Sequence, residues 1–385
     1  MTAPYDPSQR EKVVAKLPES LRRDLKVRAA QLGVDIKDAV TDGIGNWLSD
    51  GAEYTTVDMA GSRSFSTYIP TGMYAELKQA AKKKGLAINQ SLAQSIRAWL
   101  DAHPATAKRA QSKGGCRYVV CNQKGGVGKT AVTAGLGQAL AERGARVLLV
   151  DFDPQCHLTS QFGFEPIGLE EPSLAKKMLG EAKILKLRDL IEPIETESFA
   201  GRLFLLPSST YAFLLDAKLA TAPGLRVRET ALETALEEVE SDFDYILIDC
   251  PPSLGYTMDN ALYYGRTRDG EDPGCSGVLT VVQAEDSSAD AYRLLQNQIN
   301  DLAADFKLDL DQLGIVVNLY DAGRGYIATS SLENWHAVGD PAVLSVVPDL
   351  KEQREAVRLK RPLLEYAPES KQADAMRELA RRLSE

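Results

Sequence analysis

Residues 121–135 read CNQKGGVGKTAVTAG, a glycine-rich loop that leads into a helical pattern. The segment 117–121 before it, RYVVC, has the apolar character of a buried strand, and the helical pattern ends at Gly144. A loop between a strand and a helix is the setting in which backbone N–H groups wrap phosphate oxygens, because glycine has no Cβ to block a close approach. The sequence therefore predicts a phosphate-binding loop.

The loop departs from the common pattern G-x-x-x-x-G-K-[ST], which requires glycine at position 123. Gln123 stands there, and a second lysine, Lys124, lies five residues before Lys129. We expect Lys129 to reach the β- and γ-phosphates of a nucleotide and the hydroxyl of Thr130 to ligate Mg²⁺. The second lysine has no role in the common pattern and needs another explanation.

Two acidic segments downstream support a nucleotide site. They read VLLVDFDPQ at 147–155 and DYILIDCPPSLG at 244–255, and each places aspartate directly after an apolar run. In an open α/β sheet, ligand chemistry is expected at the carboxyl ends of the strands. The two segments are therefore candidate parts of the same site as the loop.

These motifs carry a resemblance to a known family. KGGVGKT at 124–130 resembles the deviant Walker A motif of the ParA/MinD superfamily of ATPases, and the preceding NQ is typical of the ParA branch. The two acidic segments are similar to the next family motifs, the second of them to Walker B. The resemblance covers about residues 115–385. It continues through VVQAE at 281–285, GIVVNLYD at 314–321 and EYAPESKQADAMRELARRL at 365–383.

The resemblance implies an ATP-dependent homodimer in which Lys124 crosses into the site of the other subunit and offsets phosphate charge. Hydrolysis would then depend on dimerisation, and Asp153 would orient the attacking water. The implied catalytic residues are Lys124, Lys129 and Asp153. The implied nucleotide-binding residues are Lys124, Gly125, Gly126, Val127, Gly128, Lys129, Thr130, Ala131 and, for adenine, Asn318. Mg²⁺, the second cofactor beside ATP, would be held or supported by Thr130, Asp151 and Asp249.

The resemblance further implies nonspecific DNA binding by the ATP dimer and a partner of the ParB type, or another adaptor, that triggers hydrolysis and release. Such a cycle moves plasmids, chromosomes or other cargo, and it implies a cytoplasmic, nucleoid-associated protein. The basic residues at matching positions are Arg324, Lys351, Arg354 and Arg358. Isolated basic residues are otherwise ordinary surface charge, and true phosphate contacts weaken steeply with salt.

An internal repeat precedes the part that resembles the ATPases. The segments 12–51 and 64–103 align without a gap at an offset of 52 residues, with Trp47 matching Trp99. Each copy predicts a short strand, a helix, a glycine turn and a second helix. One such unit cannot bury its strand, but two units can by pairing their strands into an antiparallel ribbon.

The arrangement resembles the ribbon-helix-helix DNA-binding fold, here as a tandem pair in one chain. In that family the ribbon enters the major groove and its outward side chains read bases. The implied readers are Lys16, Ser66 and Tyr68, with Lys12 and Val14 as further candidates. This module would bind operator DNA and regulate the protein's own synthesis. The alternative is a module that docks a protein partner, with the ATPase positioning a cargo other than DNA.

Charge and composition constrain these readings. Residues 1–114 hold 17 basic and 12 acidic residues, a net of +5, and the remaining residues hold 28 and 42, a net of −14. No run approaches 18 consecutive apolar residues, and the N-terminus lacks the apolar core of a signal peptide. Of the functions considered, a MinD-like membrane regulator is the least favoured, because the C-terminal segment has few large apolar residues to insert into a membrane. Five cysteines without a C-x-x-C pair predict reduced, buried thiols.

The predicted fold class is α/β, a P-loop doubly wound, mostly parallel sheet preceded by a small (β-α-α)₂ domain. The expected boundaries are 1–104 for the tandem module, 105–115 for a linker and 116–385 for the ATPase domain. Apolar runs that alternate with helical stretches predict the strands. These runs are 117–121, 146–151, 203–206, 244–249, 278–282, 313–318 and 343–347.

Overall fold

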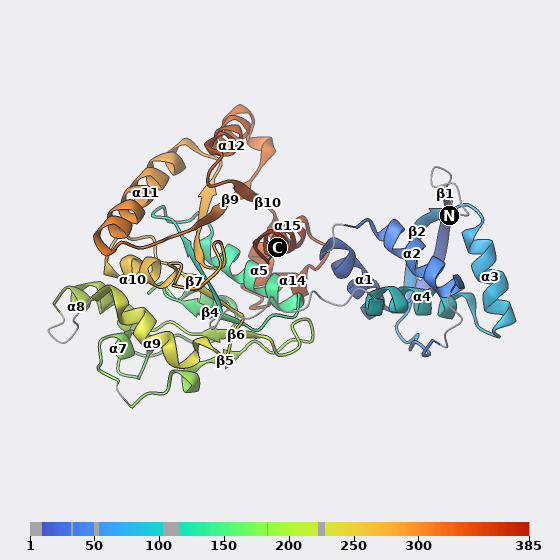
Figure 1. The fold of residues 1–385 in the computed structure, drawn as a ribbon, viewed down its shortest axis with the longest axis horizontal. Helices are drawn as coiled ribbons and strands as arrows, with labels where there is room; N and C mark the ends of the chain where they lie inside the picture. The colour runs from blue at the N-terminus through green and yellow to red at the C-terminus, as the bar shows by residue number, and fades with distance from the viewer. Residues whose placement is uncertain are drawn as a thin grey trace. The chain divides into compact units, whose positions relative to one another are not determined.

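The computed structural model describes residues 10–31, 34–49, 54–102, 115–182, 184–221 and 228–384. The chain divides into two compact units, Met1–Ala107 and Lys108–Glu385 (Figure 1). Of the predicted linker, only Gly115 is among the described residues, so the proposed boundaries of that linker stay a prediction. No helix in the described part of the chain combines the length and apolar character needed to cross a membrane.

An eight-stranded sheet organises the larger unit (Figure 1). Its strand order is β10-β9-β8-β3-β7-β4-β6-β5, and every neighbouring pair is parallel except β5 with β6. The mostly parallel α/β sheet is therefore confirmed, and the seven predicted strands match all but the two-residue β5. The strands are β3 (Cys116–Cys121), β4 (Val147–Asp151), β5 (Glu192–Pro193), β6 (Leu203–Leu206), β7 (Tyr245–Asp249), β8 (Gly277–Gln283), β9 (Gln312–Tyr320) and β10 (Val343–Pro348).

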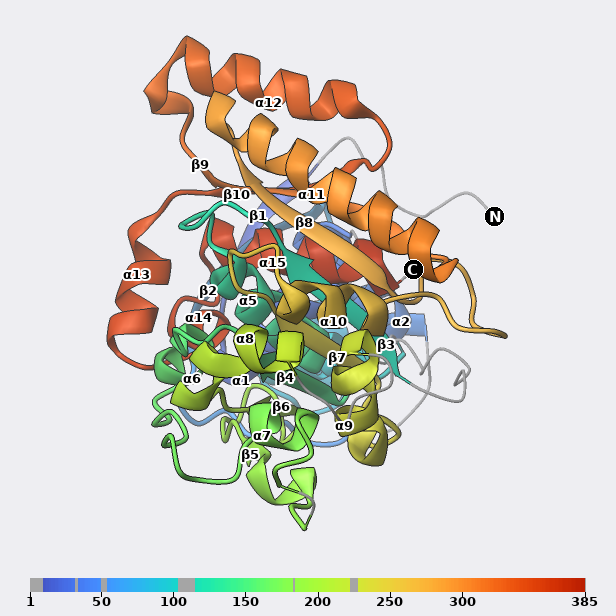
Figure 2. The same cartoon turned by 90° about the vertical axis from the view of Figure 1, so that its left-hand side faces the viewer.

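Both faces of this sheet are buried, as a parallel sheet requires. Successive side chains of β3 illustrate this, since Tyr118 and Val120 join one apolar cluster and Val119 and Cys121 join the other. Helices α5 and α15 cover the first face, α9, α10 and α11 cover the second, and α11 and α12 lie beside β8 and β9 (Figure 2). The helices are α5 (Lys129–Glu142), α6 (His157–Gln161), α7 (Leu174–Met178), α8 (Leu215–Thr221), α9 (Ala231–Glu240), α10 (Tyr256–Tyr264), α11 (Asp286–Phe306), α12 (Tyr326–Val338), α13 (Lys351–Arg358), α14 (Leu363–Tyr366) and α15 (Lys371–Ser384).

The strand order reverses around β3. Strand β7 lies on one side of β3, and the next strand in the sequence, β8, lies on the other side. Such a reversal leaves a crevice at the carboxyl ends of the strands, where ligands bind in doubly wound folds. The glycine-rich loop follows β3 directly, so the fold places it at this crevice.

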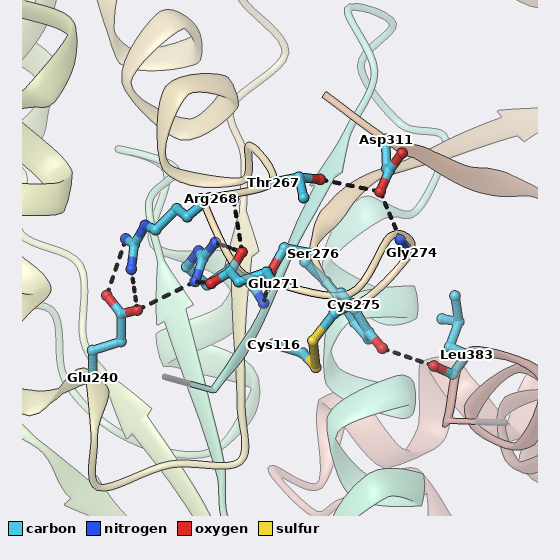
Figure 3. Close-up of a disulfide and its surroundings, with 12 residues drawn as sticks. Cys116, Glu240, Thr267, Arg268, Glu271, Gly274, Cys275, Ser276, Asp311 and Leu383 are labelled. Carbon is cyan, nitrogen blue, oxygen red and sulfur yellow. Dashed lines mark hydrogen bonds and ion pairs between the residues drawn. A yellow bond between two sulfur atoms is a disulfide. The ribbon is translucent and has the colours of Figure 1, made fainter. Parts of the chain in front are cut away.

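A disulfide corrects the prediction that all cysteines are reduced thiols. Cys116, at the start of β3, is bonded to Cys275, just before β8, across a Cα separation of 5.3 Å (Figure 3). The two residues lie 159 positions apart in sequence, and only the pairing of β3 with β8 brings them together. Cys121, Cys156 and Cys250 are free and buried, as predicted.

The smaller unit is built on an antiparallel ribbon of β1 (Arg10–Leu17) and β2 (Arg63–Pro70), in which Val14 lies opposite Ser66. The side chains on one face of the ribbon, Val13 and Ile69 among them, are buried. Four helices cover that face in two similar pairs. They are α1 (Glu19–Gln31), α2 (Ile36–Ser49), α3 (Met73–Lys83) and α4 (Ile88–Ala102). Gly85 follows α3 with a φ of +68°, while its counterpart Gly33 lies outside the described residues.

Candidate nucleotide and magnesium site

The loop between β3 and α5 requires glycine at two positions. Gly126 has a φ of +76° and Gly128 a φ of +85°, which L-residues rarely adopt. A Cβ on Gly128 would also lie 2.1 Å from Nδ2 of Asn318. The loop therefore closes so tightly on its neighbours that a side chain at position 128 would collide with them.

Three amide side chains hold the loop in this shape. Asn318, in β9, donates from Nδ2 to the carbonyl of Val127 at 2.9 Å, and Gln283, at the end of β8, donates to the carbonyl of Gly126 at 3.4 Å. Asn122 is fully buried and donates to a carbonyl of β8 at 2.7 Å. Asn318, which the resemblance implies as an adenine contact, thus supports the loop itself in this structure.

Lys129 begins α5 and points into the protein. Its side chain is buried, and Nζ donates to the carbonyl oxygen of Lys124 at 3.3 Å. Burial lowers the pKa of Lys129, while the nearby carboxylates of Asp249 and Asp153 oppose that shift. A buried ammonium at the end of a glycine loop is the arrangement that binds phosphate charge.

Two aspartates stand side by side at the carboxyl end of the sheet. Asp151 of β4 and Asp249 of β7 are Cα partners in the parallel pairing. Oδ2 of Asp151 accepts hydrogen bonds from the backbone N (2.7 Å) and Oγ1 (2.6 Å) of Thr159, and Oδ1 of Asp249 accepts from Oγ1 of Thr133 at 3.2 Å. The other oxygens, Oδ1 of Asp151 and Oδ2 of Asp249, are buried and have no hydrogen-bond partner among the described residues.

Without a bound cation, these two carboxyl groups are costly to ionise. Burial raises the pKa of Asp151 to about 7, and burial together with the neighbouring charge of Asp151 raises the pKa of Asp249 well above its usual value. The nearby hydroxyl of Thr130 lowers the pKa of Asp249 in part. Two buried carboxylates with unpartnered oxygens need a cation, because desolvation otherwise disfavours their charged forms.

The donor set fits Mg²⁺ bound together with a nucleotide. Carboxylate and hydroxyl oxygens are the hard ligands that Mg²⁺ prefers, and Thr130 and Asp249 supply both kinds. Across residues 10–384, apart from the undescribed gaps, no three His, Cys, Asp or Glu side chains form a metal cage. Such an ion would therefore complete its shell with phosphate and water oxygens, as Mg²⁺ in nucleotide sites does.

Asp153 lies two residues beyond β4 and is held by the backbone. Its Oδ1 accepts from the amide of Gln155 at 2.9 Å, and its carbonyl oxygen accepts from Oγ of Ser208 at 2.9 Å. Its side chain is buried, and its charge acts on Lys129 and Asp249. The structure thus brings Asp153 into the same cluster as the loop lysine and the paired aspartates.

Lys124 belongs to an ion-pair chain that leads away from the loop. Its Nζ lies 3.0 Å from Oε2 of Glu285, whose Oε1 lies 3.3 Å from Nη1 of Arg324. Nη2 of Arg324 contacts Asp349 at 3.4 Å, and Asp349 pairs with Nη1 of Arg354 at 2.7 Å. The chain joins the second lysine of the loop to two of the basic residues predicted to bind DNA.

The remaining predicted DNA contacts are also exposed. Lys351 and Arg358 lie with Arg354 on α13 at positions spaced by three and four residues, which places them on one side of that helix. In the smaller unit, Lys16, Ser66 and Tyr68 all lie on the exposed face of the ribbon.

Several residues at this site were missed by sequence reasoning. They support the loop or the aspartates rather than forming its motifs, and most carry no local signal in the sequence. Gln283 and Glu285 stand in VVQAE, a segment noted for its likeness to the family but given no role. The missed residues are Asn122, Thr133, Thr159, Gln283 and Glu285.

Comparisons with known proteins place the chain in a family. Residues 117–310 match the family described as AAA domain. The sporulation initiation inhibitor protein Soj of Bacillus subtilis is 31% identical over 265 residues, which are 69% of this chain and 96% of that protein. The chromosome-partitioning ATPase Soj of Thermus thermophilus is 32% identical over 265 residues, 69% of this chain and 93% of that protein.

A solved structure is also similar to this chain. Cobyrinic acid a,c-diamide synthase from Mycobacterium smegmatis, with a bound ATP analogue and magnesium, is 31% identical, covers 69% of this chain and 93% of its own, and superimposes with a TM-score of 0.53. The chain belongs to the ParA/MinD/Soj family of P-loop ATPases. Within that family it is a partition or positioning ATPase of the ParA/Soj type.

Proposed function

We propose that the protein forms ATP-dependent dimers, binds DNA nonspecifically in that state and drives the partition of a plasmid or chromosome. The observation that carries this proposal is the second lysine of the loop. Lys124 is not needed to close the loop on phosphate in its own chain, since Lys129 already points into the site. A charge placed beside the site but directed away from it suits a role in a second subunit.

The residues of the site divide the nucleotide chemistry among them. The loop from Gly125 to Thr130 and the ammonium of Lys129 would bind the β- and γ-phosphates of ATP. Thr130 and Asp249 would hold Mg²⁺, which neutralises charge that develops on the phosphates. Asp151 would support that region from beside Asp249, and Asp153 would orient the attacking water.

The pair of Lys124 with Glu285 costs little to break. Its pair with Glu285 is partly exposed, with 23% and 40% of the two side chains accessible. Pairs of this kind are worth at most about 1 kcal/mol. Phosphate charge in a closed dimer interface offers a stronger interaction, so ATP-bound dimers would draw Lys124 across and make hydrolysis depend on association.

The same transfer would reach the proposed DNA-binding surface of Arg324, Lys351, Arg354 and Arg358. Glu285 contacts both Lys124 and Arg324. Once Lys124 leaves, Glu285 keeps its contact with Arg324, so the transfer would change the charge beside that surface. A ParB-type or adaptor protein would trigger hydrolysis and release, and DNA binding would keep the ATP form on the nucleoid.

The smaller unit would act as a tandem ribbon-helix-helix module that binds operator DNA. Its antiparallel ribbon presents Lys12 and Lys16 among exposed residues, with four helices behind it. A second candidate is a protein-docking module that serves a cargo other than DNA. It is favoured by the exposed apolar surface of Val14 and Tyr68, which are 58% and 53% accessible at the middle of the ribbon. Loss of operator binding in Lys16→Ala would support the first role.

Two lysine variants test the proposal. Lys129→Ala should abolish ATP binding, whereas Lys124→Ala should bind ATP normally and hydrolyse none. Fluorescent-nucleotide titration and phosphate release measure the two properties. Tight ATP binding by Lys129→Ala would contradict the assignment of the phosphate loop. Normal turnover by Lys124→Ala would contradict the role of Lys124 in the site of the other subunit.

A further inference from the structure

The exposed face of the ribbon has two chemically different halves. The repeat relates residue 12 to 64, 14 to 66 and 16 to 68. The strand register places Val14 directly opposite Ser66, its own counterpart, so the approximate two-fold axis of the smaller unit passes through that pair. A ribbon made of two identical chains would carry the same residue at each related position.

None of the three related pairs on this face is chemically alike. Lysine at 12 corresponds to Ser64, and lysine at 16 corresponds to Tyr68. At the centre, an apolar valine corresponds to a serine. All six side chains are exposed on one face of the ribbon. The chemical difference between the two strands therefore lies on the surface that a ligand would contact.

The flanks of the ribbon differ in charge as well. The amide of Lys16 donates to Oδ1 of Asn89 at 3.2 Å, so the start of α4 adjoins one end of the ribbon. Arg10 pairs with Asp38 at 2.6 Å, so the start of α2 adjoins the other end. The start of α2 carries the charged residues Asp35, Lys37 and Asp38, with Asp35 paired to Lys37 at 2.6 Å. The corresponding residues at α4 are uncharged: Ala87, Asn89 and Gln90.

The segment just before α4 adds positive charge to its side. Lys82 and Lys83 are exposed there, and the matching positions of the first copy are Ala30 and Gln31. The ammonium of Lys84 lies 4.6 Å from the ring centroid of Trp47 in the first copy. Over the whole repeat, the second copy holds five basic and two acidic residues against seven and six in the first. The second copy therefore offers backbone phosphates more net positive charge than the first, where Asp35 and Asp38 are paired with Lys37 and Arg10.

We propose that one chain of this protein binds one asymmetric segment of duplex DNA, in contrast to the inverted repeat that a symmetric ribbon dimer reads. This inference rests on the proposed DNA binding of the smaller unit. The face from residue 12 to 16 spans about 14 Å along the strand, which matches about four base pairs at 3.4 Å each. Lys12 and Lys16 would each favour guanine, at opposite ends and from the same strand of the ribbon.

The proposal is tested by selecting duplexes from a random library with the full chain, without nucleotide and in excess nonspecific competitor. We expect an enriched element without two-fold symmetry, bound by one chain per duplex in native mass spectrometry. Lys12→Ala and Lys16→Ala should each lower affinity about ten-fold and relax selectivity at different ends of the element.

A triple variant, S64K/S66V/Y68K, makes the exposed faces of the two strands identical. All three positions are exposed, so the fold should persist, and ATP turnover serves as the control. This variant should enrich an inverted repeat. If the natural chain itself enriches an inverted repeat, the asymmetry proposal is wrong while DNA binding stands. If nothing is enriched and Lys12→Ala and Lys16→Ala change nothing, the DNA-binding role of the smaller unit is wrong as well.

Discussion

Three glycines of the phosphate loop offer a graded test of how the site is built. Gly125 has open space around it and an ordinary backbone conformation, so Gly125→Ala should change the unfolding free energy by less than about 0.5 kcal/mol. Gly126 also has open space but a φ of +76°. Placing alanine in that left-handed conformation should cost about 1–2 kcal/mol.

Gly128→Ala adds a collision to the same backbone cost. The new Cβ would lie 2.1 Å from Nδ2 of Asn318, which is buried and donates to the carbonyl of Val127. Moving Asn318 leaves a buried hydrogen-bonding group without its partner, at a cost of about 1–3 kcal/mol. The total for Gly128→Ala is then about 2–5 kcal/mol.

Urea unfolding of the nucleotide-free protein, followed by circular dichroism, measures the series, with the transition of the larger unit as the readout. Alanine also restricts the unfolded chain relative to glycine, but this effect is common to all three variants and cancels in their differences. Equal stabilities for Gly126→Ala and Gly128→Ala would show that the close approach of Asn318 costs nothing. Equal stabilities for Gly125→Ala and Gly126→Ala would refute the backbone argument.

Three further predictions concern the ion-pair chain, the buried carboxylates and the disulfide. Glu285→Gln removes the carboxylate beside Lys124. Each dimer would break two such exposed pairs, each worth at most about 1 kcal/mol, so the variant should lower the protein concentration needed for ATP-dependent dimers by up to about thirty-fold. Sedimentation should show no such change for Asp290→Asn, in the helix that follows Glu285. The pKa of Asp151 is about 7 in the folded protein and 3.8 in the unfolded chain, so the folded state binds more protons between these values and its stability falls as pH rises through them. Asp151→Asn should therefore stabilise the nucleotide-free protein increasingly from pH 4 to pH 7, by up to about 4 kcal/mol, and a pH-independent difference in urea unfolding would contradict this. Cys275→Ser should lower the unfolding free energy by about 2–5 kcal/mol under non-reducing conditions. Reductant should destabilise the natural chain but not the variant. An unfolding free energy of the natural chain that does not change with reductant would contradict the bond to Cys116.

The sequence predicted those parts of the fold whose signals are local. Strands such as β3 and β7 are short apolar runs that end at a loop or an aspartate, and both were placed within a residue of their observed ends. Asp151 and Asp249 could be assigned to one site because carboxyl ends of parallel strands meet at one edge of a sheet. The exposed and buried alternation of the ribbon was predictable for the same kind of reason, since it follows the two-residue period of a strand.

The supporting residues could not be predicted, because they depend on which strands become neighbours. Gln283 and Asn318 reach the loop since β8 lies beside β3 and β9 beside β8, an order that no spacing in the sequence reveals. The pairing of Cys116 with Cys275 follows from the same order. Thr159 contacts Asp151 from eight residues further along only because the chain turns back after β4.

The most direct test of the central claim, that Lys124 acts in the site of the other subunit, is ATP turnover in a mixture of two inactive variants. Lys124→Ala keeps its own Asp153, and Asp153→Ala keeps its own Lys124. Mixed before ATP is added, they should form heterodimers in which one of the two sites is complete. Random pairing in a two-fold dimer gives about a quarter of the natural activity. Recovery to that level would establish the role in trans, and a mixture as inactive as its components would contradict it.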